Sequence, residues 1–120
     1  MLEDKIYHSS CDVIIGDWEY FGKFLKKNKI EGCENNLNWY AETGHFHNDD
    51  GSIMGYYIRI PEIDFTSKNY AVIVHELSHL TFHILDDVGI KFGADNQEPY
   101  TYLLEMLLVD FLKKAMKSYK

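Results

Sequence analysis

The stretch Val74-His75-Glu76-Leu77-Ser78-His79-Leu80 places two histidines four residues apart, with a glutamate directly after the first. Residues four apart on a helix lie on the same face, with Cβ atoms about 5–6 Å apart. Two imidazole rings at that separation can bind one zinc ion through nitrogens about 2.0–2.1 Å from it. Glu76 lies one step round the helix, where it can take a proton from water without binding the metal. The spacing therefore predicts a helical zinc site in which His75 and His79 are ligands and Glu76 is the general base.

The neighbouring residues predict that this helix packs into the protein interior. Between Ala71 and Phe82, all residues other than the histidines and glutamate of the motif are uncharged. Buried polar groups without partners cost about 1–3 kcal/mol each, so buried histidines favour a metal site over a solvated helix face. We expect the helix to begin near Ser67 and to end at Asp86 or Asp87, before Gly89. The 3.6-residue period predicts a core stripe of Ile73, Val74, Leu77, Leu80 and Ile84.

Length and composition predict one globular domain over residues 1–120. The chain is 46% hydrophobic and 15% aromatic, which favours a packed core over disorder. Its net charge of −7 disfavours nucleic acid and anionic membranes as partners. No apolar run approaches the roughly 20 residues of a membrane helix, and the first residues do not resemble a signal peptide. We therefore expect a cytoplasmic protein in which Cys11 and Cys33 are reduced thiols.

The rest of the chain predicts an α+β fold with three helices and a short, mainly antiparallel sheet. Cys11–Ile15 is expected to be extended because it contains the β-branched run Val13-Ile14-Ile15, and a helix follows Asp17, a favourable N-cap. Leu37–Phe46 and Ile53–Ile60 predict a hairpin, because residues 48–51 have the composition of a turn. A last helix begins after Asn96, buries a leucine-rich stripe and ends in lysines.

The motif and its surroundings resemble the zincin metallopeptidases, and more narrowly the small zincin-like proteins encoded by bacteriophages. The resemblance runs from about Gly55 to Leu108. It comprises Gly55-Tyr56-Tyr57-Ile58-Arg59-Ile60-Pro61, then Ile73-Val74-His75-Glu76, and then Asn96-Gln97-Glu98 leading into Tyr100-Thr101-Tyr102-Leu103.

This resemblance implies a minimal zincin-like domain and a zinc-dependent hydrolase, a small metallopeptidase of phage origin that acts on a peptide or protein. The compartment would then be the host cytoplasm, with association to the virion also open. In zincins the strand before the motif helix lines the cleft and can pair with an extended peptide. By resemblance, Tyr56–Ile60 is that strand here.

A catalytic zinc site usually has three protein ligands and one open position. His83 follows His79 by four residues, but it lies eight residues after His75, or about 12 Å along a helix, so one ion cannot bind both. The resemblance to glutamate-type zincins places the third ligand at Glu98, in the first turn of the last helix. Glu105 and Asp95 remain alternatives.

Residues around the ligands offer further roles. The glutamate-type families often have an acid four residues after the third ligand, where this chain has Tyr102. Glu105, one turn further along, is the candidate for orienting a ligand histidine. Tyr57, Tyr100 and Tyr102 are candidates for a hydrogen bond to the developing oxyanion, and the sequence does not choose among them.

Two other functions compete with a peptidase. One is a non-enzymatic phage virion or assembly protein, in which zinc stabilises a zincin scaffold that binds other phage structural proteins. The short chain favours this alternative because it leaves little length for substrate subsites. An intact Glu76 favours the enzyme, since a structural site has no use for a base. The other is hydrolysis of a non-peptide amide, such as cell-wall material.

Overall fold

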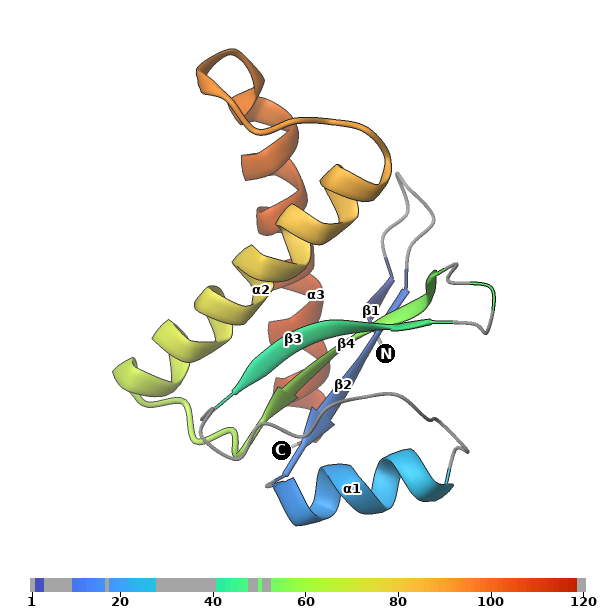
Figure 1. Cartoon of the computed structure of the whole chain (residues 1–120). Helices are drawn as coiled ribbons and strands as arrows, with labels where there is room; N and C mark the ends of the chain where they lie inside the picture. Colours follow the sequence, from blue (N-terminus) through green and yellow to red (C-terminus); the bar gives the residue numbers. More distant parts are fainter. Residues whose placement is uncertain are drawn as a thin grey trace.

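The computed structural model describes residues 2–3, 10–16, 18–27, 41–47, 50 and 53–118. Their four strands lie side by side in the order β1 (Leu2–Glu3), β2 (Ser10–Ile15), β4 (Ile53–Ile60) and β3 (Glu42–His47) (Figure 1). β2 pairs with β4 in parallel, whereas β1 pairs with β2 and β3 pairs with β4 in antiparallel orientation. The sheet is therefore mixed, with its parallel pair at the centre.

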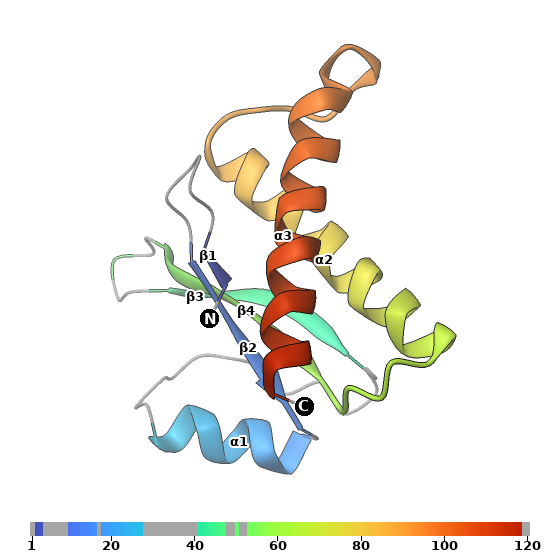
Figure 2. The ribbon, with the colours of Figure 1, turned by 180° about the vertical axis from the view of Figure 1, so that it is seen from behind.

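The helices are α1 (Trp18–Lys27), α2 (Ser67–Asp87) and α3 (Gln97–Ser118), with a short 3-10 turn, η1 (Ala94–Asn96), before α3. α2 packs against β3 and β4, and α3 packs against α2 and β1. Figures 1 and 2 show α1 beyond the end of β2, outside the layer that α2 and α3 form. The α+β class is confirmed. Three helices were expected. Two of them, α2 and α3, follow the last strand in the sequence and form the layer that packs on the sheet.

The core lies between the sheet and these two helices. β4 contributes Tyr56, Ile58 and Ile60, which alternate along one face as a strand requires. The buried apolar residues of the two helices repeat at three- and four-residue spacing: Ile73, Leu77, Leu80, Ile84 and Leu85 on α2, and Leu103, Leu107 and Phe111 on α3.

The predicted core stripe of α2 is wrong at one position. Val74 is 38% exposed, whereas its neighbour Ile73 is fully buried. Successive residues on a helix differ by about 100° in direction, so the two cannot share one narrow face. The helix is thus half-buried rather than enclosed, and His75 and His79 lie on its exposed part.

The boundaries of α2 are confirmed, and side chains fix its beginning. Thr66 is the N-cap, and its hydroxyl accepts a hydrogen bond from the Asn69 backbone N–H at 3.2 Å. The Asn69 side chain is buried and bonds backward, accepting from Phe65 N and donating to Glu62 O. These bonds hold the connection from β4 at a fixed angle to α2.

The hairpin is confirmed in part. β4 has the predicted bounds, and β3 begins at Glu42 among the described residues, while residues 37–40 of the predicted strand and most of its turn lie outside them. The register shifts between Phe46 and His47. Cys11 is buried as a free thiol, with its pKa raised to about 12 mainly by burial; Cys33 lies outside the described residues.

β4 is an inner strand, which corrects the role that the resemblance implied for Tyr56–Ile60. Its backbone pairs with β2 on one side and β3 on the other, so it has no open edge for a peptide. β3 forms the edge of the described sheet beside α2. Within the described part of the chain, no helix combines the length and hydropathy needed to cross a bilayer.

Candidate functional site

His75 and His79 meet on the exposed face of α2. Their Nε2 atoms are 3.1 Å apart, and their ring planes are inclined at 75°. At this distance the two nitrogens can share one proton or bind one ion. Two nitrogens that each lie about 2.0–2.1 Å from a tetrahedral zinc would be separated by about 3.3 Å, so the observed pair fits a zinc ion with little adjustment.

Glu76 is buried beside this pair and is held by β3. The Thr43 hydroxyl lies 2.6 Å from Glu76 Oε2 and 3.0 Å from the Glu76 backbone oxygen, and it can donate to either. A buried carboxylate is costly unless hydrogen bonds compensate for lost water, so this contact accounts for how Glu76 remains 5% exposed. The motif helix and β3 are thus joined at the proposed base.

A cavity of about 340 Å³ opens in front of these residues. It is lined by three histidines and a glutamate of α2 and by residues at the start of β3: His75, Glu76, His79, His83, Ala41, Glu42 and Thr43. Its lining is rich in groups that hold or move protons, and both predicted ligands face it together with the predicted base. The structure therefore assembles His75, Glu76 and His79 at one place.

Glu42 adds a second buried carboxyl group to this cavity. Its Oε1 lies 3.9 Å from Arg59 Nε, and both side chains are almost fully buried. Arg59 Nη1 also donates to Gly16 O at 3.1 Å. Burial raises the pKa of Glu42 to about 7; the Arg59 guanidinium opposes this shift, and the Glu76 carboxylate adds to it. Glu42 is therefore a carboxyl group that titrates near neutral pH beside the proposed base.

The predicted third ligand does not lie beside the histidines. Glu98, Glu105 and Asp95 are all exposed, and the described residues contain no group of three or more His, Cys, Asp or Glu side chains placed to hold one metal ion. The reason is the direction from which α3 approaches. α3 packs on the buried stripe of α2, whereas His75 and His79 lie on the exposed face of that helix.

The tyrosine candidates also lie elsewhere. Tyr57 points to the opposite face of the sheet from the core residue Tyr56, where its ring stacks on Phe46 at 4.8 Å. A Cβ at Gly44 would lie 2.8 Å from the Tyr57 ring, so glycine is required opposite it. Tyr102 is 65% exposed, and Tyr100 lines a different pocket. None of the three lines the cavity of His75 and His79.

Sequence reasoning missed the contribution of β3. Thr43 and Glu42 are not part of any spacing pattern, and the hydrogen bond that joins Thr43 to Glu76 spans 33 residues. His83, rejected as a ligand partner of His75, nevertheless lines the same cavity, and its ring lies 5.6 Å from that of His45 on β3. The available signal was weak: Thr43 and His45 alternate on one face of a predicted strand.

Comparison of the chain with models of protein families, with curated proteins and with solved structures finds no match.

Proposed function

We propose that this protein is a zinc-dependent hydrolase, a small metallopeptidase of the zincin-like kind found in phages. The observation that supports this best is the arrangement on one cavity wall of two imidazoles, 3.1 Å apart, and a buried glutamate next to them. Two ligands and an adjacent carboxylate are among the groups that metal-assisted hydrolysis of an amide uses.

His75 and His79 would hold the zinc through their Nε2 atoms. When bound, zinc polarises a carbonyl and lowers the pKa of water towards about 7. The remaining coordination positions would be filled by water or by a further group facing the cavity. Glu98 is not proposed again as a ligand, because α3 lies on the other side of α2.

Glu76 would be the group that moves the proton. Thr43 donates to its Oε2, which leaves Oε1 to accept a proton from the attacking water and return it to the leaving amine. The Thr43 bond restricts the orientation of the carboxylate, and a fixed orientation adds to the efficiency of a general base. Thr43 is thus a positioning residue for Glu76.

An extended substrate would pair with β3. This strand is the edge of the described sheet, and its first residues, Glu42 and Thr43, line the cavity. A peptide added along an edge strand gains main-chain hydrogen bonds that do not depend on its sequence. Its scissile bond would then lie beside Glu76.

One observation favours a structural alternative. A buried carboxylate that already accepts a hydrogen bond from Thr43 stabilises the contact between α2 and β3 whether or not it acts as a base. A phage virion or assembly protein that uses zinc to stabilise this scaffold would retain the same contact.

The variant Glu76→Gln distinguishes the peptidase from the structural alternative. Glutamine is nearly isosteric and can still accept the Thr43 hydrogen bond, so zinc content and melting temperature should match the wild type. Loss of the base should lower cleavage of denatured casein by about 10²–10⁴-fold. Equal cleavage by wild type and variant would exclude Glu76 as the base, and absence of cleavage by the zinc-loaded wild type would favour the scaffold.

A further inference from the structure

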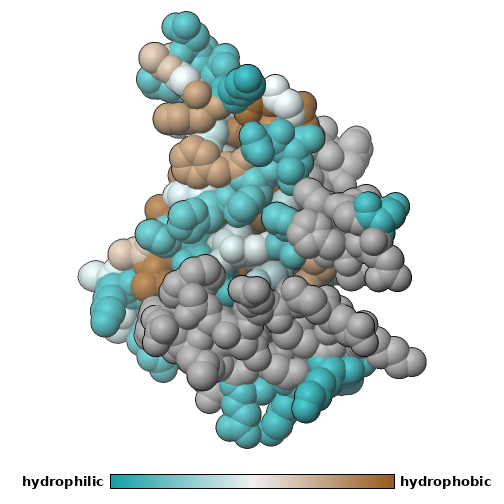
Figure 3. Space-filling model, viewed as in Figure 1, coloured by the Kyte–Doolittle hydropathy of each residue, from teal (hydrophilic) through white to brown (hydrophobic). Residues whose placement is uncertain are grey.

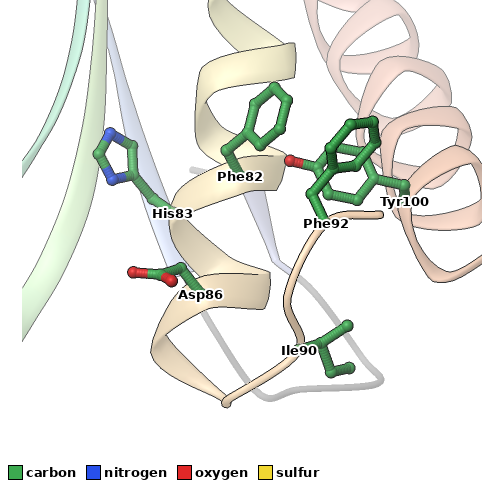
Figure 4. A pocket seen from close by; sticks show the side chains of 6 residues that line it. All are labelled: Phe82, His83, Asp86, Ile90, Phe92 and Tyr100. Carbon is green, nitrogen blue, oxygen red and sulfur yellow. The ribbon is translucent and has the colours of Figure 1, made fainter. Parts of the chain in front are cut away.

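A second pocket lies one helical turn beyond the histidine site. It has a volume of about 220 Å³ and is lined by the end of α2, the following loop and the start of α3: Phe82, His83, Asp86, Ile90, Phe92 and Tyr100 (Figure 4). Pockets for drug-sized ligands measure about 300–1,000 Å³, so this one is of a size for a single side chain.

Three aromatic rings form one wall of the pocket. The ring of Tyr100 lies 4.5 Å from Phe82 and 4.7 Å from Phe92, in edge-to-face geometry. Phe82 and Phe92 nevertheless remain 44% and 62% exposed. Figure 3 shows hydrophobic surface interrupting the hydrophilic surface in the upper part of the molecule, where α2 and α3 lie close together. Apolar rings left open to water in a concave site favour an apolar ligand.

Tyr100 provides an independent sign of a missing partner. Its side chain is 8% exposed, and its hydroxyl makes no hydrogen bond with any described residue. Figure 4 shows this hydroxyl directed from α3 towards the α2 residues that line the pocket. Burial, with a smaller contribution from Asp86, raises the pKa of Tyr100 to about 12, so the phenol is protonated at neutral pH. A buried donor of this kind favours a ligand that brings an acceptor.

The pocket adjoins the proposed active site at His83. This residue lines both cavities and follows His79 by one helical turn, about 6 Å along α2. A side chain seated against the packed rings of Phe82, Phe92 and Tyr100 would therefore belong to a residue close to the scissile bond of a peptide lying along β3.

We propose that this pocket is a specificity subsite that receives one aromatic or branched aliphatic side chain of the substrate, while the Tyr100 hydroxyl donates to a carbonyl oxygen of the same residue. The assignment to a substrate rests on the proposed peptidase function. The recognised chemistry is an apolar side chain with an adjacent amide carbonyl, which amino-acid amides reproduce.

Binding can be measured without catalysis. N-acetyl-phenylalanine amide, titrated into the zinc-loaded full chain and followed by NMR, should shift the ring signals of Phe82, Phe92 and Tyr100. It should bind about tenfold more tightly than N-acetyl-alanine amide. Phe92→Ala should abolish this difference, while Val109→Ala, which removes an apolar side chain 47% exposed on α3, should leave it unchanged.

Tyr100→Phe separates a ligand contact from a structural one. It keeps the ring and removes only the hydroxyl, so it should weaken binding roughly 2- to 10-fold. Because this hydroxyl has no described partner, the melting temperature should stay the same or rise. A fall in melting temperature with unchanged binding would show that the Tyr100 hydroxyl has a structural partner. That result would overturn its proposed role as a donor to the ligand's carbonyl oxygen.

Cleavage of a peptide library completes the test. The wild type should prefer an aromatic or branched aliphatic residue at one position next to the cut, and Phe92→Ala should lose that preference while still cleaving. Cleavage without preference, together with equal binding of the two amides, overturns the subsite and leaves the peptidase standing. Selective binding without any cleavage overturns the peptidase but retains the pocket as an apolar side-chain site.

Discussion

α2 has β3 on one side and α3 on the other, and these two sides are built from different chemistry. Towards β3 the helix presents a carboxylate and three imidazoles, and the contact includes the hydrogen bond between Thr43 and Glu76. Towards the core, which it shares with α3 and the sheet, it presents Leu77, Leu80 and Ile84, which are fully or almost fully buried. The apolar side fixes the position of the helix, and the polar side is thereby free to hold groups that exchange protons or bind a metal.

This difference between the two sides of α2 explains how the proposed site can lie near the surface and still have a fixed geometry. The conformational freedom of His75 and His79 is limited by the helix to which they belong, and the helix is held from behind by apolar packing. From the front it is held by Thr43, which also fixes the orientation of Glu76. Substitutions on the two sides should therefore differ in what they change.

The largest loss of stability is expected on the apolar side. Leu80 is fully buried, so Leu80→Ala should lower the free energy of unfolding by about 2–5 kcal/mol. Val74→Ala, on the same helix but 38% exposed, is the matched control and should cost less than about 1 kcal/mol. Urea denaturation measures both. Similar losses for the two variants would contradict the burial of this face.

On the polar side, Thr43→Val should have a smaller effect on stability and a specific effect on activity. Hydrogen bonds to charged groups are worth about 1.5–3 kcal/mol, and Val keeps the branched shape. Thr101→Val removes an exposed hydroxyl that bonds within α3, so it should change stability by less than about 0.5 kcal/mol. The account also predicts lower cleavage for Thr43→Val at unchanged zinc content; unchanged cleavage would remove Thr43 as a positioning residue.

Glu42 makes the polar side sensitive to pH. Its pKa of about 7 in the folded protein lies above its ordinary value of 4.5, so the folded state binds this proton more tightly than the unfolded chain does. Its contribution to stability is complete below about pH 4.5 and is lost as the pH rises through about 7. The stability of the wild type relative to Glu42→Gln should therefore decline over that range. If the free energies of unfolding of the wild type and Glu42→Gln change with pH in the same way, the pKa of Glu42 is not raised.

The smallest effects are expected from the acidic residues of α3. Glu98 and Glu105 are exposed and lie on a helix that packs against the apolar side of α2. Glu98→Ala and Glu105→Ala should leave the zinc affinity unchanged in a competition assay with a fluorescent chelator. A large loss in Glu98→Ala would show that α3 reaches the histidines after all.

Local features of the sequence predicted the helix and the site residues that it contains. The start of α2 near Ser67 and its end before Gly89 are properties of neighbouring residues, and the structure agrees with them. His75, Glu76 and His79 come together for the same reason, because their spacing is that of one helix.

Features that depend on tertiary packing were predicted less well. Two of the three strand pairings are antiparallel, as expected, but β2 pairs with β4 in parallel, and no local pattern indicates that pairing. That arrangement makes β4 an inner strand and leaves β3 at the edge of the described sheet. Glu98 was assigned as a ligand by resemblance; in the structure it is exposed, and no group of three or more metal-binding side chains forms among the described residues.

Zinc content, measured by elemental analysis after purification without chelators, decides whether His75 and His79 hold a metal ion. We expect one zinc per wild-type chain, retention of that zinc in Glu98→Ala, and its loss in His75→Ala and in His79→Ala, with all four proteins folded by circular dichroism. Full zinc occupancy in both histidine variants would contradict the site on α2.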